Sequence, residues 1–119
     1  MRTNQTNLTS KLITASHFPG AATAAVVTIA AVADLLSTKT VWVIRRITYS
    51  YSAAPTGGRL TAVFGSTTLL DIDITAAGPG MFTFNQDNVL TNNTGNEEVV
   101  ITLASGGGAV VGKLAVQYQ

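Results

Sequence analysis

The sequence contains a single histidine, His17, and no cysteine. Imidazole is the side chain best suited to move protons near neutral pH, but a Ser–His–Asp triad must hold it in a fixed orientation. His17 lies in a polar N-terminal segment beside Phe18 and Pro19, where no regular element is predicted. Without cysteine there is no thiolate nucleophile, disulfide or thiolate metal ligand. We therefore expect an exposed or partner-packed histidine and no catalytic residue.

Carboxylates offer a second kind of chemistry. Asp71 and Asp73 are two residues apart in an alternating apolar stretch, so they share one face of a predicted strand. Two carboxylates that flank a cleft can hydrolyse a glycosidic bond, and carboxylate oxygens also bind Ca²⁺. No Asp-x-Asp-x-Asp-Gly loop surrounds them, and Arg45, Arg46 and Arg59 are potential partners on neighbouring strands. We expect a solvated, ion-paired face with no metal and no cofactor.

Three aromatic side chains lie on the most regular predicted strand, residues 40–52. Alternation places Tyr49 and Tyr51 on one face and Trp42 on the other. Exposed aromatic rings on a sheet can stack on sugars or anchor a protein interface. The alternative is that the tyrosine face belongs to the core, with the hydroxyl groups at its rim.

Composition limits the possible partners. Only 11% of the 119 residues are charged and the formal net charge is +1, with Arg45-Arg46 as the one basic cluster. This distribution argues against a nucleic-acid partner, which needs a basic patch. The longest apolar stretch, 21–36, is interrupted and shorter than a membrane span. It also lacks the pattern of a signal peptide, so we expect no membrane association and retention in the compartment of synthesis.

The apolar patterns predict short strands separated by turn residues, and no amphipathic helix lies between them. This spacing is typical of an antiparallel all-β sandwich or barrel of seven or eight strands. The turn 54–58 predicts a hairpin, and Gly78-Pro79-Gly80 predicts a break before the next strand. The predicted strands are 24–32, 40–52, 59–64, 67–74, 81–85, 97–103 and 109–118.

Residues 1–20 have no sustained apolar period and end in Pro19-Gly20. We interpret them as an N-terminal arm attached to a sandwich domain over residues 21–119. The arm is either a free tail or a segment that orders against a neighbour. Its apolar anchors would be Leu8, Leu12, Ile13 and Phe18.

Three stretches resemble small structural proteins encoded by tailed bacteriophages: YSYSAAPTGGRL at 49–60, DIDITAAGPGMFTF at 71–84 and VVITLASGGGAVVGKLAV at 99–116. The resemblance covers about residues 41–118. It implies a virion component with a jelly-roll-like sandwich, similar to a capsid decoration or cement protein. Such a protein would be made in the host cytoplasm, form a homotrimer on the capsid surface and bind the major capsid protein.

We therefore expect a capsid-decorating protein that bridges neighbouring capsid subunits. The alternatives are a carbohydrate-binding module or a tail or fibre component of a phage, while a hydrolase using Asp71 and Asp73 is disfavoured. The residues expected at the interface are Leu8, Leu12, Ile13, Phe18, Trp42, Tyr49 and Tyr51.

Overall fold

The computed structural model describes residues 12–31, 41–85, 88–92 and 97–119. Within these ranges the chain forms nine strands and no helix. The described residues therefore contain no helix that could cross a membrane. The strands are β1 (Ile13–His17), β2 (Ala25–Ile29), β3 (Val43–Tyr51), β4 (Arg59–Phe64), β5 (Thr67–Asp73), β6 (Gly78–Thr83), β7 (Leu90–Thr91), β8 (Val99–Leu103) and β9 (Gly112–Tyr118).

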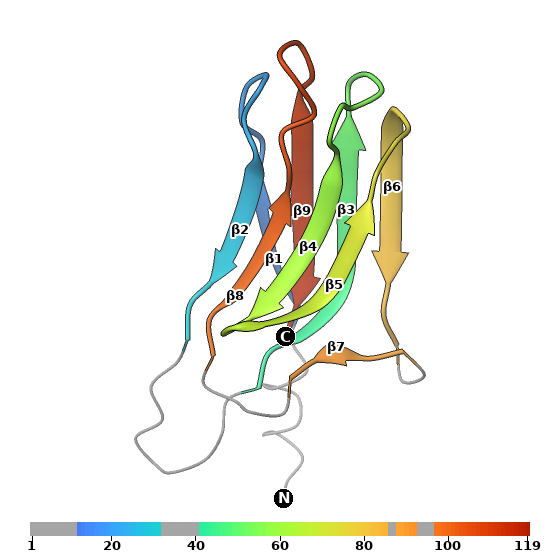
Figure 1. The fold of residues 1–119 in the computed structure, drawn as a ribbon. Coiled ribbons are helices and arrows are strands. Elements are labelled where there is room, and N and C mark those ends of the chain that lie inside the picture. Colours follow the sequence, from blue (N-terminus) through green and yellow to red (C-terminus); the bar gives the residue numbers. More distant parts are fainter. Residues whose placement is uncertain (1–11, 32–40, 86–87, 93–96) are drawn as a thin grey trace, which may run out of the picture.

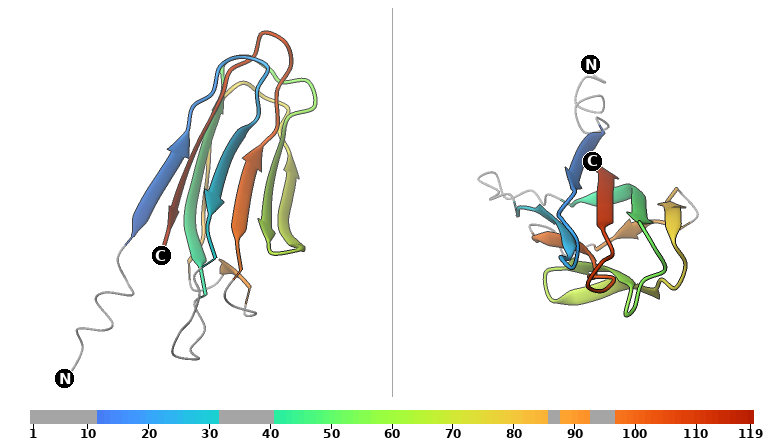
Figure 2. Two further views of the ribbon diagram at one scale, coloured as in Figure 1. Left: turned by 90° about the vertical axis from the view of Figure 1, so that its left-hand side faces the viewer. Right: turned by 90° about the horizontal axis from the view of Figure 1, so that it is seen from above.

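The strands form two antiparallel sheets, which the view from above in Figure 2 shows as two layers. Sheet A has the order β1-β9-β3-β6, with the short β7 also paired to β3, and sheet B has the order β2-β8-β4-β5 (Figure 1). Apart from β7, the pairs β1–β9, β2–β8, β3–β6 and β4–β5 nest like one long rolled-up hairpin. This is a jelly roll, which confirms the predicted all-β sandwich.

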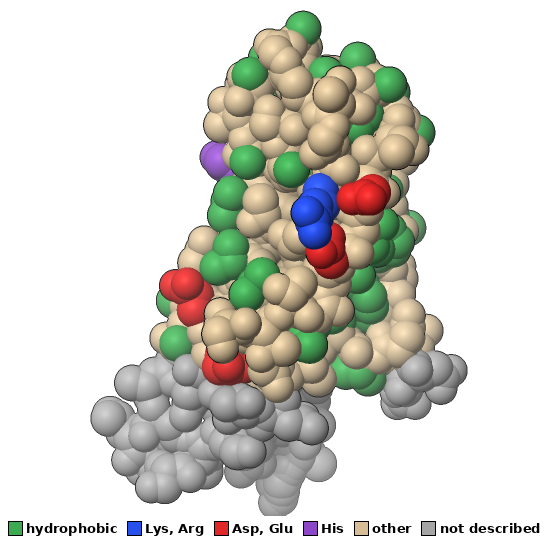
Figure 3. All heavy atoms as spheres, viewed as in Figure 1, with side chains coloured by type: hydrophobic (Ala, Val, Ile, Leu, Met, Phe, Trp, Pro, Cys, Tyr) green, Lys and Arg blue, Asp and Glu red, His purple; other side chains and the backbone are tan. Residues whose placement is uncertain are grey.

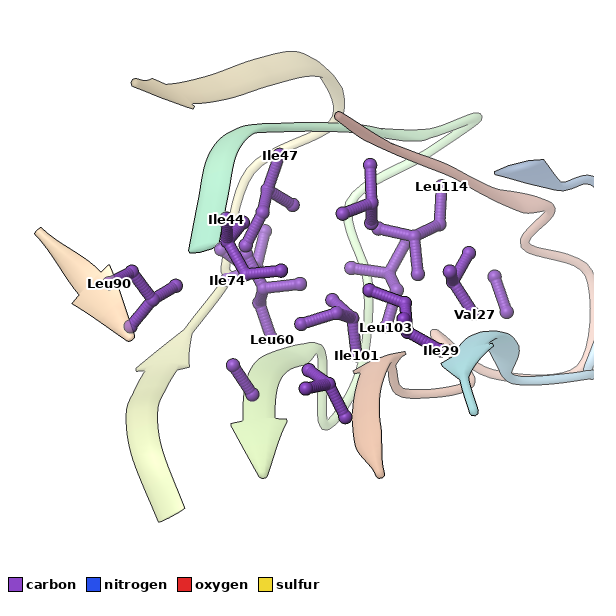
Figure 4. Packing of buried hydrophobic residues seen from close by; sticks show 14 of the residues in the cluster. Val27, Ile29, Ile44, Ile47, Leu60, Ile74, Leu90, Ile101, Leu103 and Leu114 are labelled. Atoms are coloured by element: carbon purple, nitrogen blue, oxygen red, sulfur yellow. The ribbon is translucent and has the colours of Figure 1, made fainter. Parts of the chain in front are cut away.

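The core lies between the two sheets. Along β2, buried Ala25, Val27 and Ile29 alternate with exposed residues, as the two-residue period of a half-buried strand requires. In Figure 4 aliphatic side chains from both sheets point toward one another across this space. Those fully buried include Ile44, Ile47, Leu60, Ile101, Leu103 and Leu114.

A β-bulge in β3 changes the predicted faces of this strand. Opposite β9 the register shifts between Ile44 and Arg46, so Arg45 is the inserted residue. Ile44 and Ile47 are both fully buried although they are three residues apart. The predicted strict alternation over 40–52 is therefore wrong, because a bulge breaks the two-residue period.

Two predicted connections also differ from the structure. Residues 52–58 do not close a hairpin, because β3 belongs to sheet A and β4 to sheet B. Gly78-Pro79-Gly80 does not break the chain but begins β6. Proline lacks the N–H that a central strand needs, and β6 tolerates Pro79 because it lies at the edge of sheet A.

The sandwich begins earlier than the sequence indicated. Ile13 to His17 of the predicted arm form β1, which pairs with β9 along its whole length. The first strand of the roll therefore lies in the segment that was assigned to the arm. Residues 1–11, including Leu8, lie outside the described residues.

Candidate functional site

The most exposed apolar side chains of the N-terminal segment lie on and beside β1. Leu12, Ile13 and Phe18 are 49%, 42% and 62% exposed, and Val26 on the adjacent β2 is also exposed. Among the described strands β1 ends sheet A and β2 ends sheet B, and the two strands are in contact. We call Leu12, Ile13, Phe18 and Val26 the β1 flank. It contains three of the predicted interface residues.

His17 connects the two sheet edges. Its side chain is exposed, and its Nδ1 accepts a hydrogen bond of 2.9 Å from the backbone N–H of Val26. Because β2 is an edge strand, this N–H has no strand partner on its outer side. The histidine therefore satisfies a backbone donor, which gives it a structural role at this edge.

Tyr51 is a core residue, contrary to its prediction as an interface anchor. Its side chain is 1% exposed, and its hydroxyl donates a hydrogen bond of 2.6 Å to the carbonyl oxygen of Ala104. Desolvation by burial raises the pKa of the Tyr51 hydroxyl above its ordinary value. The bonded hydroxyl lets an aromatic ring fill the core without leaving a polar atom unsatisfied. This matches the alternative in which the tyrosine face is core.

Trp42 and Tyr49 are partly buried and packed against the core. The indole of Trp42 meets Tyr118 edge-on at 5.3 Å between ring centroids, and its Nε1 donates to the carbonyl oxygen of Ala30 at 3.1 Å. Tyr49 stacks on Phe82 at 5.8 Å and packs against Gly80, where a Cβ atom would overlap its ring. Intramolecular contacts thus hold both rings, and neither forms an open platform.

The two aspartates face solvent on sheet B, as predicted. The guanidinium of Arg59 forms a bidentate ion pair with Asp71, with 2.6 Å between Nε and Oδ1. The hydrogen bond from Arg59 lowers the pKa of the Asp71 carboxyl below its ordinary value of 3.8. The pair therefore stabilises the fold above that value, and its contribution is lost as the pH falls through the lowered pKa.

In the described ranges, no three histidine or acidic side chains gather where they could hold a metal ion. Asp73 lies directly opposite Arg59 in the β4–β5 ladder. This arrangement is the ion-paired face expected from the sequence.

A surface groove of about 440 Å³ opens beside the β3 bulge. Sequence reasoning missed it, although two consecutive arginines inside an alternating strand were a signal for a bulge. The lining residues are Leu12, Arg45, Arg46, Thr83, Phe84, Gln117 and Gln119.

No protein-family model and no curated protein matches the chain. Among solved structures, a carbohydrate-binding module, CBM36, in complex with calcium and xylotriose is 17% identical, with a TM-score of 0.48 over 87% of this chain and 78% of that chain. A chain of the virus-like particle of the extra small virus of the giant freshwater prawn Macrobrachium rosenbergii is 13% identical. Its TM-score is 0.31, over 91% of this chain and 78% of that chain.

Endospore appendages of Bacillus, described as disulfide-linked pili, are 18% identical to the chain. Their TM-score is 0.34, over 91% of this chain and 83% of that chain. The TM-scores of all three structures are below 0.5, which is too low to support a conclusion about the function of the chain.

Proposed function

We propose that the chain is a virion structural protein of the capsid-decorating kind, which assembles with copies of itself and with the major capsid protein through the β1 flank. The observation that carries this proposal is the exposure of Ile13 on the edge strand β1 and of Leu12 and Phe18 at its two ends. Edge strands with exposed apolar side chains are sites where another chain can pair or pack. The low charge content favours close contact between protein surfaces.

The energetics suit an assembly of many weak contacts. Fully burying a leucine, isoleucine or phenylalanine side chain stabilises by about 1.5–3 kcal/mol. The side chains of the β1 flank are already partly covered, so each contributes a fraction of that value. Repeated copies on a shell raise the effective concentration, which turns modest contacts into stable attachment.

The first test is the solution mass of the full chain, measured by light scattering during size-exclusion chromatography. We expect a trimer, three times the chain mass of 12.3 kDa. The double substitution Ile13→Ser and Phe18→Ser removes apolar surface from the β1 flank and should yield monomers. Met81→Ser is the matched control, because Met81 is 58% exposed on β6 at the other edge of sheet A.

Cosedimentation with undecorated shells of the major capsid protein provides the second readout. The unsubstituted chain and Met81→Ser should bind, and the double variant should remain in the supernatant. A monomeric unsubstituted chain would contradict the self-assembly, and undiminished shell binding by the double variant would contradict the role of the β1 flank.

Carbohydrate binding is the alternative function. It needs an aromatic ring with an open face, whereas Tyr51 is buried and Tyr49 packs against Phe82 and Gly80. Carbohydrate binding is therefore the second candidate function, after capsid decoration. Glycan-array binding that disappears on Tyr49→Ala would reverse the order of the two proposals.

A further inference from the structure

The two sheets differ in charge. Asp71, Asp73 and Arg59 belong to sheet B, and Glu97 and Glu98 lie just before its strand β8. Figure 3 shows this side of the molecule, where acidic side chains outnumber basic ones. The strands of sheet A contain no carboxylate. Their charged residues are Arg45, Arg46 and Lys113.

The bulge in β3 brings two of these cations to one place. In a regular strand, consecutive side chains point to opposite faces, and one of the two arginines would point toward the core. The inserted Arg45 lets Ile44 and Ile47 both face the core, and Arg45 and Arg46 both line the groove. The groove is therefore cationic because of a local backbone irregularity.

Both guanidinium groups retain hydrogen-bond donors for a ligand. Arg45 donates from Nε to the side-chain oxygen Oε1 of Gln119, which orients its planar group and leaves its terminal N–H donors. The acidic side chain Asp71 pairs with Arg59 on sheet B, and the strands of sheet A supply no acidic side chain to pair with Arg45 or Arg46. Planar forks of this kind match a carboxylate in bidentate geometry.

Apart from Thr83, the remaining residues that line the groove carry apolar or amide side chains. Leu12 and Phe84 supply apolar surface, and Gln117 supplies a side-chain amide. A volume of about 440 Å³ falls within the range of small-ligand pockets. These walls suit an acidic side chain flanked by apolar residues better than a polyanion, which needs many more cations.

We propose that this groove binds a carboxylate of an acidic peptide segment on a partner protein, with Arg45 and Arg46 as its ligands. The proposal goes beyond the assembly proposed above and identifies the chemistry of a second contact. Leu12 belongs to both the groove and the β1 flank, but the variant at Ile13 and Phe18 leaves every residue lining the groove unchanged, so the two proposals are tested separately.

The test uses the full chain and a blocked peptide, acetyl-Ser-Leu-Asp-Leu-Ser-amide, with its asparagine analogue as the neutral probe. Backbone amide shifts of Phe84 and Gln117 are followed by NMR as each peptide is added. We expect saturable shifts with the aspartate peptide, and binding at least about tenfold weaker for the analogue, because hydrogen bonds to a charged group are stronger than those to a neutral amide.

Substitutions separate the guanidinium geometry from general positive charge. Arg46→Gln should weaken the peptide about tenfold, and Arg46→Lys should retain part of the affinity because it keeps the charge but loses the fork. Lys113→Gln is the matched control, since Lys113 pairs with Ser50 on the same sheet and does not line the groove. It should bind like the unsubstituted chain.

Three results would overturn the proposal. The first is equal binding of the aspartate and asparagine peptides. The second is an equal loss of binding in Arg46→Gln and Lys113→Gln, which would indicate only the overall charge of sheet A. The third is tighter, Arg46-dependent binding of a single-stranded oligonucleotide, which would assign the groove to nucleic acid.

Discussion

At the scale of single residues, the aromatic side chains differ most between expectation and structure. Tyr51 and Tyr49 belong to one strand and share a face, yet Tyr51 is sealed in the core and Tyr49 lies at its margin. Tyr51 packs against Gly106 and against Gly112 of the central strand β9, whereas Tyr49 packs over Gly80 of the edge strand β6. The Tyr51 hydroxyl also donates a hydrogen bond to the carbonyl oxygen of Ala104.

Removing this hydroxyl with Tyr51→Phe should lower the free energy of unfolding by about 1–2 kcal/mol, because the carbonyl oxygen of Ala104 loses its donor in a partly buried position. Urea denaturation followed by circular dichroism measures the change. Tyr118→Phe is the control, since the contact of Tyr118 with Trp42 involves the ring, and it should stay within about 0.5 kcal/mol. Equal effects of both substitutions would exclude a special contribution from the Ala104 bond.

At the scale of elements, β6 depends on Gly80, one of its two glycines. Gly80 pairs with Tyr49 across the β3–β6 ladder, and the tyrosine ring packs over the position where a Cβ would be. A glycine in an edge strand covered by a cross-strand aromatic ring gains packing that glycine cannot supply itself. The stack of Tyr49 on Phe82 extends this cover along β6.

Gly80→Ala should therefore destabilise the fold by about 1–3 kcal/mol, because the new methyl group displaces a ring held by its stack on Phe82. Gly20→Ala is the matched control: no atom lies within 4 Å of its added Cβ, and its backbone is not in the left-handed region. The measurement is the midpoint of thermal unfolding of each variant, compared with that of the unsubstituted chain. A Gly80 variant as stable as the Gly20 variant would mean that Tyr49 moves aside without cost.

At the scale of the whole molecule, the jelly roll closes through contacts between residues far apart in the chain. β1 pairs with β9, and β3 pairs with both β6 and β9, so sheet A needs both ends of the described chain. Trp42 joins the two layers, because it precedes β3 of sheet A and donates to Ala30, which follows β2 of sheet B. Unfolding of either sheet should therefore disturb this residue.

Trp42 is the only tryptophan, so its fluorescence is a single-site probe of the junction between the sheets. We expect its denaturation curve to coincide with the loss of β-structure measured by far-ultraviolet circular dichroism, as in two-state unfolding of a small domain. A fluorescence transition at clearly lower denaturant would show that the Trp42 end opens separately. Such a result would contradict one cooperative unit.

Local patterns in the sequence were sufficient to predict the class of fold and many of the side chains on its surface. The two-residue period placed Asp71 and Asp73 on a wet face and predicted Arg59 among their partners, because alternation depends only on neighbouring residues. The same reasoning located all seven predicted strands to within about three residues at each end, and it missed β1 and the short β7. The strand at 81–85 was predicted to start three residues late, because Pro79 breaks central strands but not edge strands.

The tertiary structure decided what depends on pairing between distant segments. The bulge at Arg45, the change of sheet after Tyr51 and the place of β1 beside β9 all follow from register with strands far away in the sequence. No local period encodes that register, since it is fixed by which side chains fill the shared core. The pattern of residues 40–52 alone therefore does not predict that Tyr51 lies in the core or that Arg45 and Arg46 line one groove.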